Sequence, residues 1–158
     1  MGKTKKITLI LGLLLCANIC FAKQISFQII QHDNRTDNVT EQSLVIEDEL
    51  LSGLFETGYI VTNSPTVVSD SESNDKVLYN KALGDALDGF SDYFIQVTIY
   101  YGNALNQIDW SIATTANGNI IKESTITGSV PTTDEKGLHK ISSKLVSEIS
   151  DFLKKQKA

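Results

Sequence analysis

Three strand-like runs in the second half of the chain are separated by turn-forming residues. The runs cover residues 93–101, 108–115 and 120–130. Gly102-Asn103 separates the first two runs, and Asn117-Gly118 separates the last two. Asn-Gly between two strands is typical of a type I′ turn, which needs positive φ at both central residues. The sequence therefore predicts an antiparallel meander of three strands.

The first half of the chain has the pattern of a strand–helix–strand unit. Residues 25–30 have the apolar–polar alternation of a strand, and a polar loop and an amphipathic helix follow. Asn38 and Glu41 have the spacing of a capping box at the start of this helix. Gly58 can take the left-handed conformation that ends a helix, and residues 59–62 form the next strand. The crossover is long enough for the two strands to pair in parallel.

Two further helices are expected from the spacing of apolar residues. One covers about residues 76–90 with Asp75 as its N-cap, after a polar, flexible loop at about residues 63–75. The other follows a helix-start pattern at 131–135 and continues to the end of the chain. The predicted order is strand–helix–strand–helix–strand–strand–strand–helix. This order indicates a single α+β domain, a mixed sheet of about five strands with helices packed on it.

Residues 1–22 have the three parts of a secretory signal peptide. Three lysines precede an apolar run from Ile7 to Leu15, and Cys20-Phe21-Ala22 places small residues at the −3 and −1 positions. We expect cleavage after Ala22, which leaves residues 23–158 as one globular domain in the periplasm or outside the cell. The apolar run is shorter than the roughly 20 residues of a spanning helix, so no membrane span is expected after processing.

A lipid anchor on a cysteine is the less favoured alternative. Acyl chains on Cys16 or Cys20 would tether the mature amino terminus to a bilayer. The usual bacterial lipobox has a small residue before the cysteine, whereas Leu15 precedes Cys16 and Ile19 precedes Cys20. The position of cleavage therefore decides between a free domain and a tethered one.

The composition after cleavage disfavours two classes of partner. Removal of residues 1–22 takes away both cysteines and three lysines, which leaves 11 basic residues against 19 acidic ones and a net charge of −8. Nucleic-acid binders need a clustered basic surface, and anionic lipid attracts basic segments. Without cysteines the domain cannot form disulfides, but about 136 residues are enough for one hydrophobic core.

The sequence predicts no catalytic, cofactor-binding or metal-binding residues. It contains no Gly-rich phosphate loop, no nucleophile elbow and no paired-histidine zinc motif. His32 and His139 lack a carboxylate or cysteine at ligand spacing, so we interpret both as solvated side chains. Glu47-Asp48-Glu49 would point in different directions on a helix and is interpreted as a solvated face.

Aromatic residues are concentrated in the predicted meander. Alternation along a strand sends them to both faces of the sheet, so one set is expected in the core. The other set could form an exposed surface for a partner, together with the polar loop that follows the first strand. The candidate partner-binding residues are Asn34, Arg35, Thr36, Tyr93, Tyr100, Tyr101 and Trp110.

Asn34-Arg35-Thr36 after the first strand and Gly58-Tyr59-Ile60-Val61 in the second carry a family resemblance. Residues 25–62 resemble the start of a group of bacterial envelope domains. This group includes the amino-terminal domain of TolB, the outer-membrane lipoproteins that activate peptidoglycan synthases, and the curli-secretion lipoprotein family. The resemblance implies a mixed α/β fold and a non-enzymatic role as a partner or assembly factor. The poor lipobox departs from the lipoprotein members.

Three functional hypotheses follow. The first is a non-enzymatic, exported accessory module of the periplasm or cell envelope that binds another envelope protein. The second is a carrier of small apolar ligands or lipids, which needs an enclosed apolar cavity. The third is an enzyme of unfamiliar type, which needs converging acid–base or nucleophilic side chains. The sequence favours the first.

Overall fold

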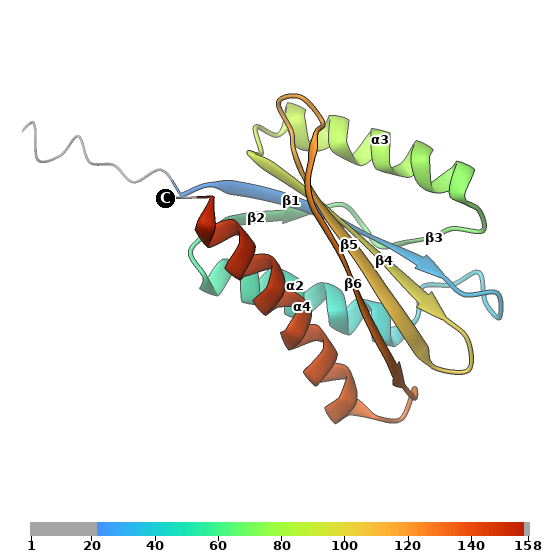
Figure 1. Ribbon diagram of the computed structural model, residues 1–158. Coiled ribbons are helices and arrows are strands. Elements are labelled where there is room, and N and C mark those ends of the chain that lie inside the picture. The colour runs from blue at the N-terminus through green and yellow to red at the C-terminus, as the bar shows by residue number, and fades with distance from the viewer. Residues whose placement is uncertain (1–21, 157–158) are drawn as a thin grey trace, which may run out of the picture.

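A mixed, six-stranded sheet forms the centre of the computed structural model, which describes residues 22–156 (Figure 1). The predicted signal peptide up to residue 21, with Cys20, lies outside the described residues. The strands are β1 (Gln24–His32), β2 (Ile60–Asn63), β3 (Val67–Val68), β4 (Tyr93–Tyr101), β5 (Leu105–Thr114) and β6 (Ile120–Val130). The helices are α2 (Glu41–Glu56), α3 (Glu72–Asp88) and α4 (Glu135–Lys155). The predicted α+β class and element order are confirmed, with the short β3 added.

The sheet combines a parallel half with an antiparallel half. The strand order is β2-β1-β4-β5-β6, and β3 also pairs with β1 beyond the end of β2. β1 is parallel to β2, β3 and β4, as expected for strands joined by helical crossovers. β4, β5 and β6 pair antiparallel in sequence order, so the predicted meander is confirmed.

The turn between β5 and β6 differs from the predicted type I′ turn. Gly118 has a φ of 68°, but Asn117 is not among the non-glycine residues of positive φ in the described chain. The strands are instead closed by a bond from the Thr114 N–H to the Asn119 carbonyl (3.0 Å) and one from the Gly118 N–H to the Thr114 carbonyl (2.9 Å). A longer loop therefore needs positive φ only at its glycine.

Two helix N-caps revise the sequence-based boundaries. Thr40, not Asn38, caps α2, because its hydroxyl accepts a hydrogen bond from the Ser43 N–H (3.3 Å). Ser71 caps α3 through the Asn74 N–H, so this helix starts before the predicted Asp75 cap. The stretch 63–75, predicted as a flexible loop, thus contains β3 and the first turn of α3.

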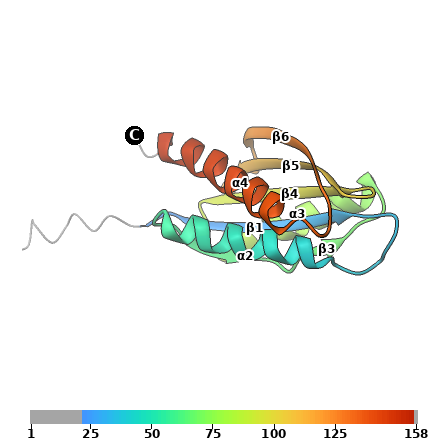
Figure 2. The same cartoon turned by 90° about the horizontal axis from the view of Figure 1, so that it is seen from below.

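The two faces of the sheet are covered unequally (Figures 1 and 2). α2 and α4 pack side by side on one face, and α3 lies on the other. Gly53 permits the close approach of α2 to α4, because a Cβ atom there would lie 2.6 Å from a methyl carbon of Val146. None of the helices within residues 22–156 is long and apolar enough to span a membrane.

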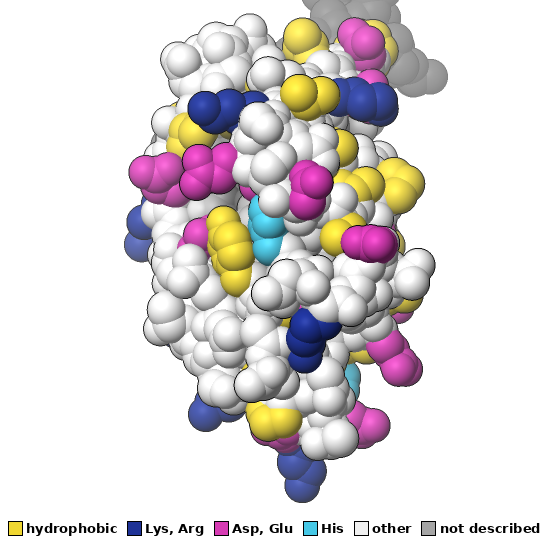
Figure 3. Space-filling view, turned by 90° about the vertical axis from the view of Figure 1, so that its right-hand side faces the viewer, with side chains coloured by type: hydrophobic (Ala, Val, Ile, Leu, Met, Phe, Trp, Pro, Cys, Tyr) yellow, Lys and Arg dark blue, Asp and Glu magenta, His cyan; other side chains and the backbone are white. Residues whose placement is uncertain are grey.

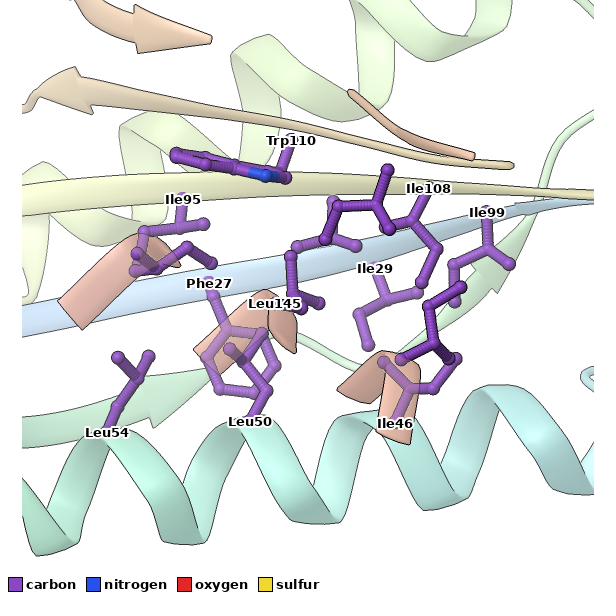
Figure 4. Close-up of a cluster of buried hydrophobic side chains, with 14 of the residues drawn as sticks. Phe27, Ile29, Ile46, Leu50, Leu54, Ile95, Ile99, Ile108, Trp110 and Leu145 are labelled. Carbon is purple, nitrogen blue, oxygen red and sulfur yellow. The ribbon is translucent and has the colours of Figure 1, made fainter. Parts of the chain in front are cut away.

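The main core fills the space between the sheet and the pair α2 and α4 (Figure 4). Ile46, Leu50 and Leu54 recur at helical spacing on α2 and are fully buried. They face alternate residues of β1 and β4, and Leu145 of α4 and Trp110 of β5 extend the same cluster. The periodicity of the sequence thus places one apolar layer on this face.

The opposite face of the sheet is much more polar. Ala82, Ala86 and Phe94 form a small buried apolar cluster there, with Tyr79 and Leu83 packed against them. Gln28 and Gln96 lie directly opposite each other on β1 and β4, and their carboxamide oxygens have no partner among the described residues. α3 is therefore held by a small apolar contact over a polar sheet.

Candidate functional site

Strands β1 and β4 run in parallel and end at the same edge of the sheet. The chain leaves β1 for α2 on one face, whereas from the neighbouring parallel strand β3 it continues into α3 on the other face. In open α/β sheets, ligands bind outside the carboxyl ends of strands at such a switch point. Figure 3 looks onto this end of the molecule, where acidic, basic and hydrophobic side chains are interspersed.

The loop at residues 33–40, which we call the anchored loop, is fixed by hydrogen bonds from the buried side chain of Gln31. This side chain is fully buried, and its amide nitrogen donates to the Asn38 carbonyl (3.0 Å). Its carboxamide oxygen accepts hydrogen bonds from the Thr40 N–H (2.8 Å) and the Ser43 hydroxyl (2.8 Å). The Ser43 hydroxyl is also bonded to the hydroxyl of Tyr101 on β4 (2.9 Å). One buried network thus joins two strands, the loop and α2.

Asp33 and Arg35 fix the tip of the anchored loop. The guanidinium of Arg35 donates from Nε and Nη2 to the two carboxylate oxygens of Asp33, both at 2.8 Å, and the Arg35 N–H donates to the same carboxylate (3.0 Å). The Asp33 side chain is 1% exposed and that of Arg35 is 40% exposed. The hydrogen bonds from Arg35 hold the pKa of Asp33 below its ordinary value of 3.8.

Two clefts lie beside the anchored loop and share Tyr101. The first, the switch cleft, has a volume of about 360 Å³. The second, the helix cleft, has about 410 Å³ and lies between the first turns of α2 and α4. The switch cleft is lined by His32, Asp33, Asn34, Asp37, Val68, Ser69, Asp70, Tyr100 and Tyr101. The helix cleft is lined by Arg35, Thr40, Glu41, Gln42, Val45, Tyr101, Thr132, Glu135, Leu138 and His139.

Both histidines have carboxylate partners, but only His139 is solvated, with a side chain that is 64% exposed against 19% for His32. His32 Nε2 lies 2.8 Å from a carboxylate oxygen of Asp75 on α3, and its ring stacks on Tyr100 with centroids 5.1 Å apart. His139 on α4 pairs with Glu49 on α2. These partners are 43 and 90 residues away in sequence, so no local spacing could indicate them.

The structure does not bring the predicted partner residues together on one surface. Tyr93, Tyr101 and Trp110 belong to the main core and are at most 8% exposed. Their side chains point to the face of the sheet that α2 and α4 cover. The prediction that they form an exposed aromatic surface is therefore wrong. Tyr100 points to the other face and lines the switch cleft. Asn34, Arg35 and Thr36 lie together in the anchored loop, where Asn34 and Arg35 are exposed.

Two ion pairs lie at this end of the sheet. Asp33 binds Arg35, and His32 binds Asp75. Burial raises the pKa of Tyr101 above its ordinary value of 10.0, so its hydroxyl stays neutral at physiological pH. Within the described residues, no group of three or more His, Cys, Asp or Glu side chains is placed to hold a metal ion.

A family model with the description "Uncharacterised protein" matches residues 24–153. The chain belongs to this family. A search of curated proteins gives no match.

Several similar solved structures come from bacteria and share little sequence identity with this chain. Lipoprotein GNA1162 from Neisseria meningitidis is 11% identical over 82% of this chain and 99% of its own, with a TM-score of 0.47. The LpoB C-terminal domain from Salmonella enterica is 15% identical over 77% and 92%, with a TM-score of 0.44. TolB from Acinetobacter baumannii is 10% identical over 77% and 26%, with a TM-score of 0.45. TolB, which the sequence resemblance names, is thus among the similar solved structures, and the resemblance is confirmed at the level of the fold.

We predict that Gln31→Leu destabilises the protein. The change leaves the Thr40 N–H and the Asn38 carbonyl without their side-chain partner and removes one hydrogen bond of the Ser43 hydroxyl, which should lower the free energy of unfolding by about 1 to 3 kcal/mol. Urea unfolding of the purified protein measures this. Gln28→Leu on the same strand is the matched control, because its oxygen has no partner to lose, and should change the free energy by less than about 1 kcal/mol. An equal decrease in the free energy of unfolding in the two variants would contradict the stabilising role of the Gln31 hydrogen bonds.

The lowered pKa of Asp33 predicts a pH-dependent contribution to stability. The contribution is fully present above the ordinary pKa of 3.8 and is lost as the pH falls through the lower folded value. The stability difference between the natural protein and Asp33→Asn should therefore be largest near neutral pH and shrink below about pH 4. Urea unfolding from pH 7 to pH 3 measures it, and Arg35→Gln should show the same trend. A difference independent of pH would refute the assignment.

Proposed function

We propose that this protein is a non-enzymatic accessory module of the bacterial cell envelope that binds another envelope protein. The anchored loop at the end of β1 and β4 is its contact surface. The observation that carries the proposal is the contrast between the two sides of this loop. On the side that faces the protein interior, the buried side chains of Gln31 and Asp33 form hydrogen bonds to the loop. On the other side, Asn34 and Arg35 are exposed to solvent. A rigid loop loses little conformational entropy when it binds.

The chemistry of the site supports binding in preference to catalysis. A hydrolase or transferase needs a nucleophile next to a base, or an acid–base pair facing a substrate. At this end of the described chain, the carboxylate of Asp33 is occupied by Arg35 and the ring of His32 by Asp75. A histidine paired with a carboxylate still has a second ring nitrogen that can act as a base. Among the described residues, however, no hydrogen bond joins the side chain of His32 or Asp33 to a serine or threonine hydroxyl, so a nucleophile–base pair is lacking at this end.

The clefts favour a protein partner over a stored lipid. A carrier encloses its apolar ligand in an apolar cavity. The switch cleft is lined largely by polar side chains, and the helix cleft has charged residues, including Glu41 and Glu135, beside its apolar ones. Such mixed lining is typical of protein interfaces, in which an apolar centre has a polar rim.

A photocrosslinking amino acid at Asn34 tests the contact surface. In the cells that make the protein, we expect one discrete crosslinked species, because a specific partner presents the same side chains to the loop in every complex. The matched control is the same amino acid at Asp88, an exposed residue that ends α3. It should give no such species. Crosslinking from both positions alike, or from neither, would rule out the anchored loop as the contact surface.

Export and cleavage are part of the same proposal. We predict that the mature protein begins at Lys23, as a soluble domain of residues 23–158, because the small residues at positions 20 and 22 fit a signal peptidase site. Mass spectrometry of the intact protein from the envelope fraction measures this directly. A chain that begins at Cys20 and carries acyl groups would replace the free domain with a tethered one. A chain that retains residues 1–22 would contradict export by cleavage.

A further inference from the structure

The helix cleft combines an apolar wall with acceptor groups. Val45, Tyr101 and Leu138 line it from α2, β4 and α4. Glu41 and Glu135, the first residues of α2 and α4, also line it and are exposed to solvent. With a volume of about 410 Å³ the cleft is large enough for a side chain and part of its backbone.

Gln42 lines this cleft, and its buried amide oxygen has no donor among the described residues. The residue is 6% exposed, and its amide nitrogen donates to the Pro131 carbonyl at 3.2 Å. A carbonyl can only accept, so this bond fixes which side of the carboxamide carries the nitrogen. The amide oxygen on the other side has no hydrogen-bond partner among the described residues. An unpartnered buried oxygen is costly, and a donor on a ligand would remove that cost.

The charges around the cleft are predominantly negative. Glu41 and Glu135 form no ion pair within residues 22–156, whereas the guanidinium of Arg35 is bound to Asp33 and the ring of His139 to Glu49. The helix N-termini balance part of the two glutamate charges. Lys136 and Lys140 lie on α4 but do not line the cleft. A cation is therefore the ligand group that these surroundings favour.

We infer that the helix cleft binds a lysine side chain of the protein partner. The apolar stem of a lysine fits against Val45, Tyr101 and Leu138, and its ammonium group has three donors and no acceptor. These donors suit the amide oxygen of Gln42 and the carboxylates of Glu41 and Glu135. The inference rests on the proposed function, because it names the chemistry of the partner at the site beside the anchored loop.

A peptide titration followed by NMR tests the inference. The probe is the pentapeptide acetyl-Ala-Ala-Lys-Ala-Ala-amide, added to the exported protein at low salt. We expect saturable shifts of the Gln42 side-chain amide and the Val45 and Leu138 methyl signals. The same peptide with norleucine or acetyl-lysine at its centre keeps the stem without the charge. It should bind about tenfold or more weakly. Equal affinity of the three peptides, or no saturable shift with lysine, would overturn the inference.

Substitution of the two glutamates by glutamine tests whether their negative charge contributes to binding of the lysine peptide. Glu41→Gln combined with Glu135→Gln should weaken binding of the lysine peptide by about fivefold or more. Glu56→Gln is the matched control, because Glu56 ends the helix that Glu41 begins, and should leave the affinity unchanged. An unchanged affinity in the double variant would also overturn the inference.

The failure of this inference can be distinguished from the failure of the proposed function. The crosslinker at Asn34 is placed in the double glutamine variant and in the natural background. We expect the crosslinked species to form in the natural background and to decrease in the double variant. A species that forms equally in both would refute the lysine site and leave the partner surface in place. No species in either background would refute the proposed function itself.

Discussion

The buried carboxamide of Gln31 is the interaction on which the end of the sheet depends. It sits at the end of β1, and through it the Asn38 carbonyl, the Thr40 N–H and the Ser43 hydroxyl are all satisfied. Without it the anchored loop would expose these groups to an apolar surrounding, where each unmade hydrogen bond is unfavourable. The same network fixes the start of α2. The exposed part of the loop and the wall of the helix cleft are therefore positioned together.

The unequal faces of the sheet explain why the candidate site is at its end. One face is closed by the apolar layer under α2 and α4, in which Phe27 and Leu50 are fully buried. The other carries α3 on a small cluster around Phe94 and is otherwise polar. At the edge where β1 and β4 end, the apolar layer under α2 and α4 lies next to the polar face that α3 covers. Both neighbouring clefts share Tyr101, whose ring belongs to the core while its hydroxyl joins the Gln31 network.

The sequence predicts the features that depend on neighbouring residues, such as the hairpin at Asn117-Gly118 and the helix end at Gly58, which has a φ of 88°. It does not predict features that depend on which face of the sheet a helix covers. Tyr100 and Tyr101 are adjacent and both line the switch cleft, yet of the two only Tyr101 belongs to the main core. The pair His32 and Asp75 forms only because α3 crosses the end of β1. The clefts combine residues from several elements, so no single motif marks them.

The helix cleft follows from the topology of the sheet. β4 is parallel to β1, and β5 is antiparallel to both of its neighbours, so β6 runs in the same direction as β1. β1 and β6 therefore end at the same edge, and the helices that follow them, α2 and α4, begin there on the same face (Figure 1). Acidic residues are favoured in the first turn of any helix. Because two such turns meet here, Glu41 and Glu135 come to line one cleft, and a local preference of helices becomes an acidic recognition surface.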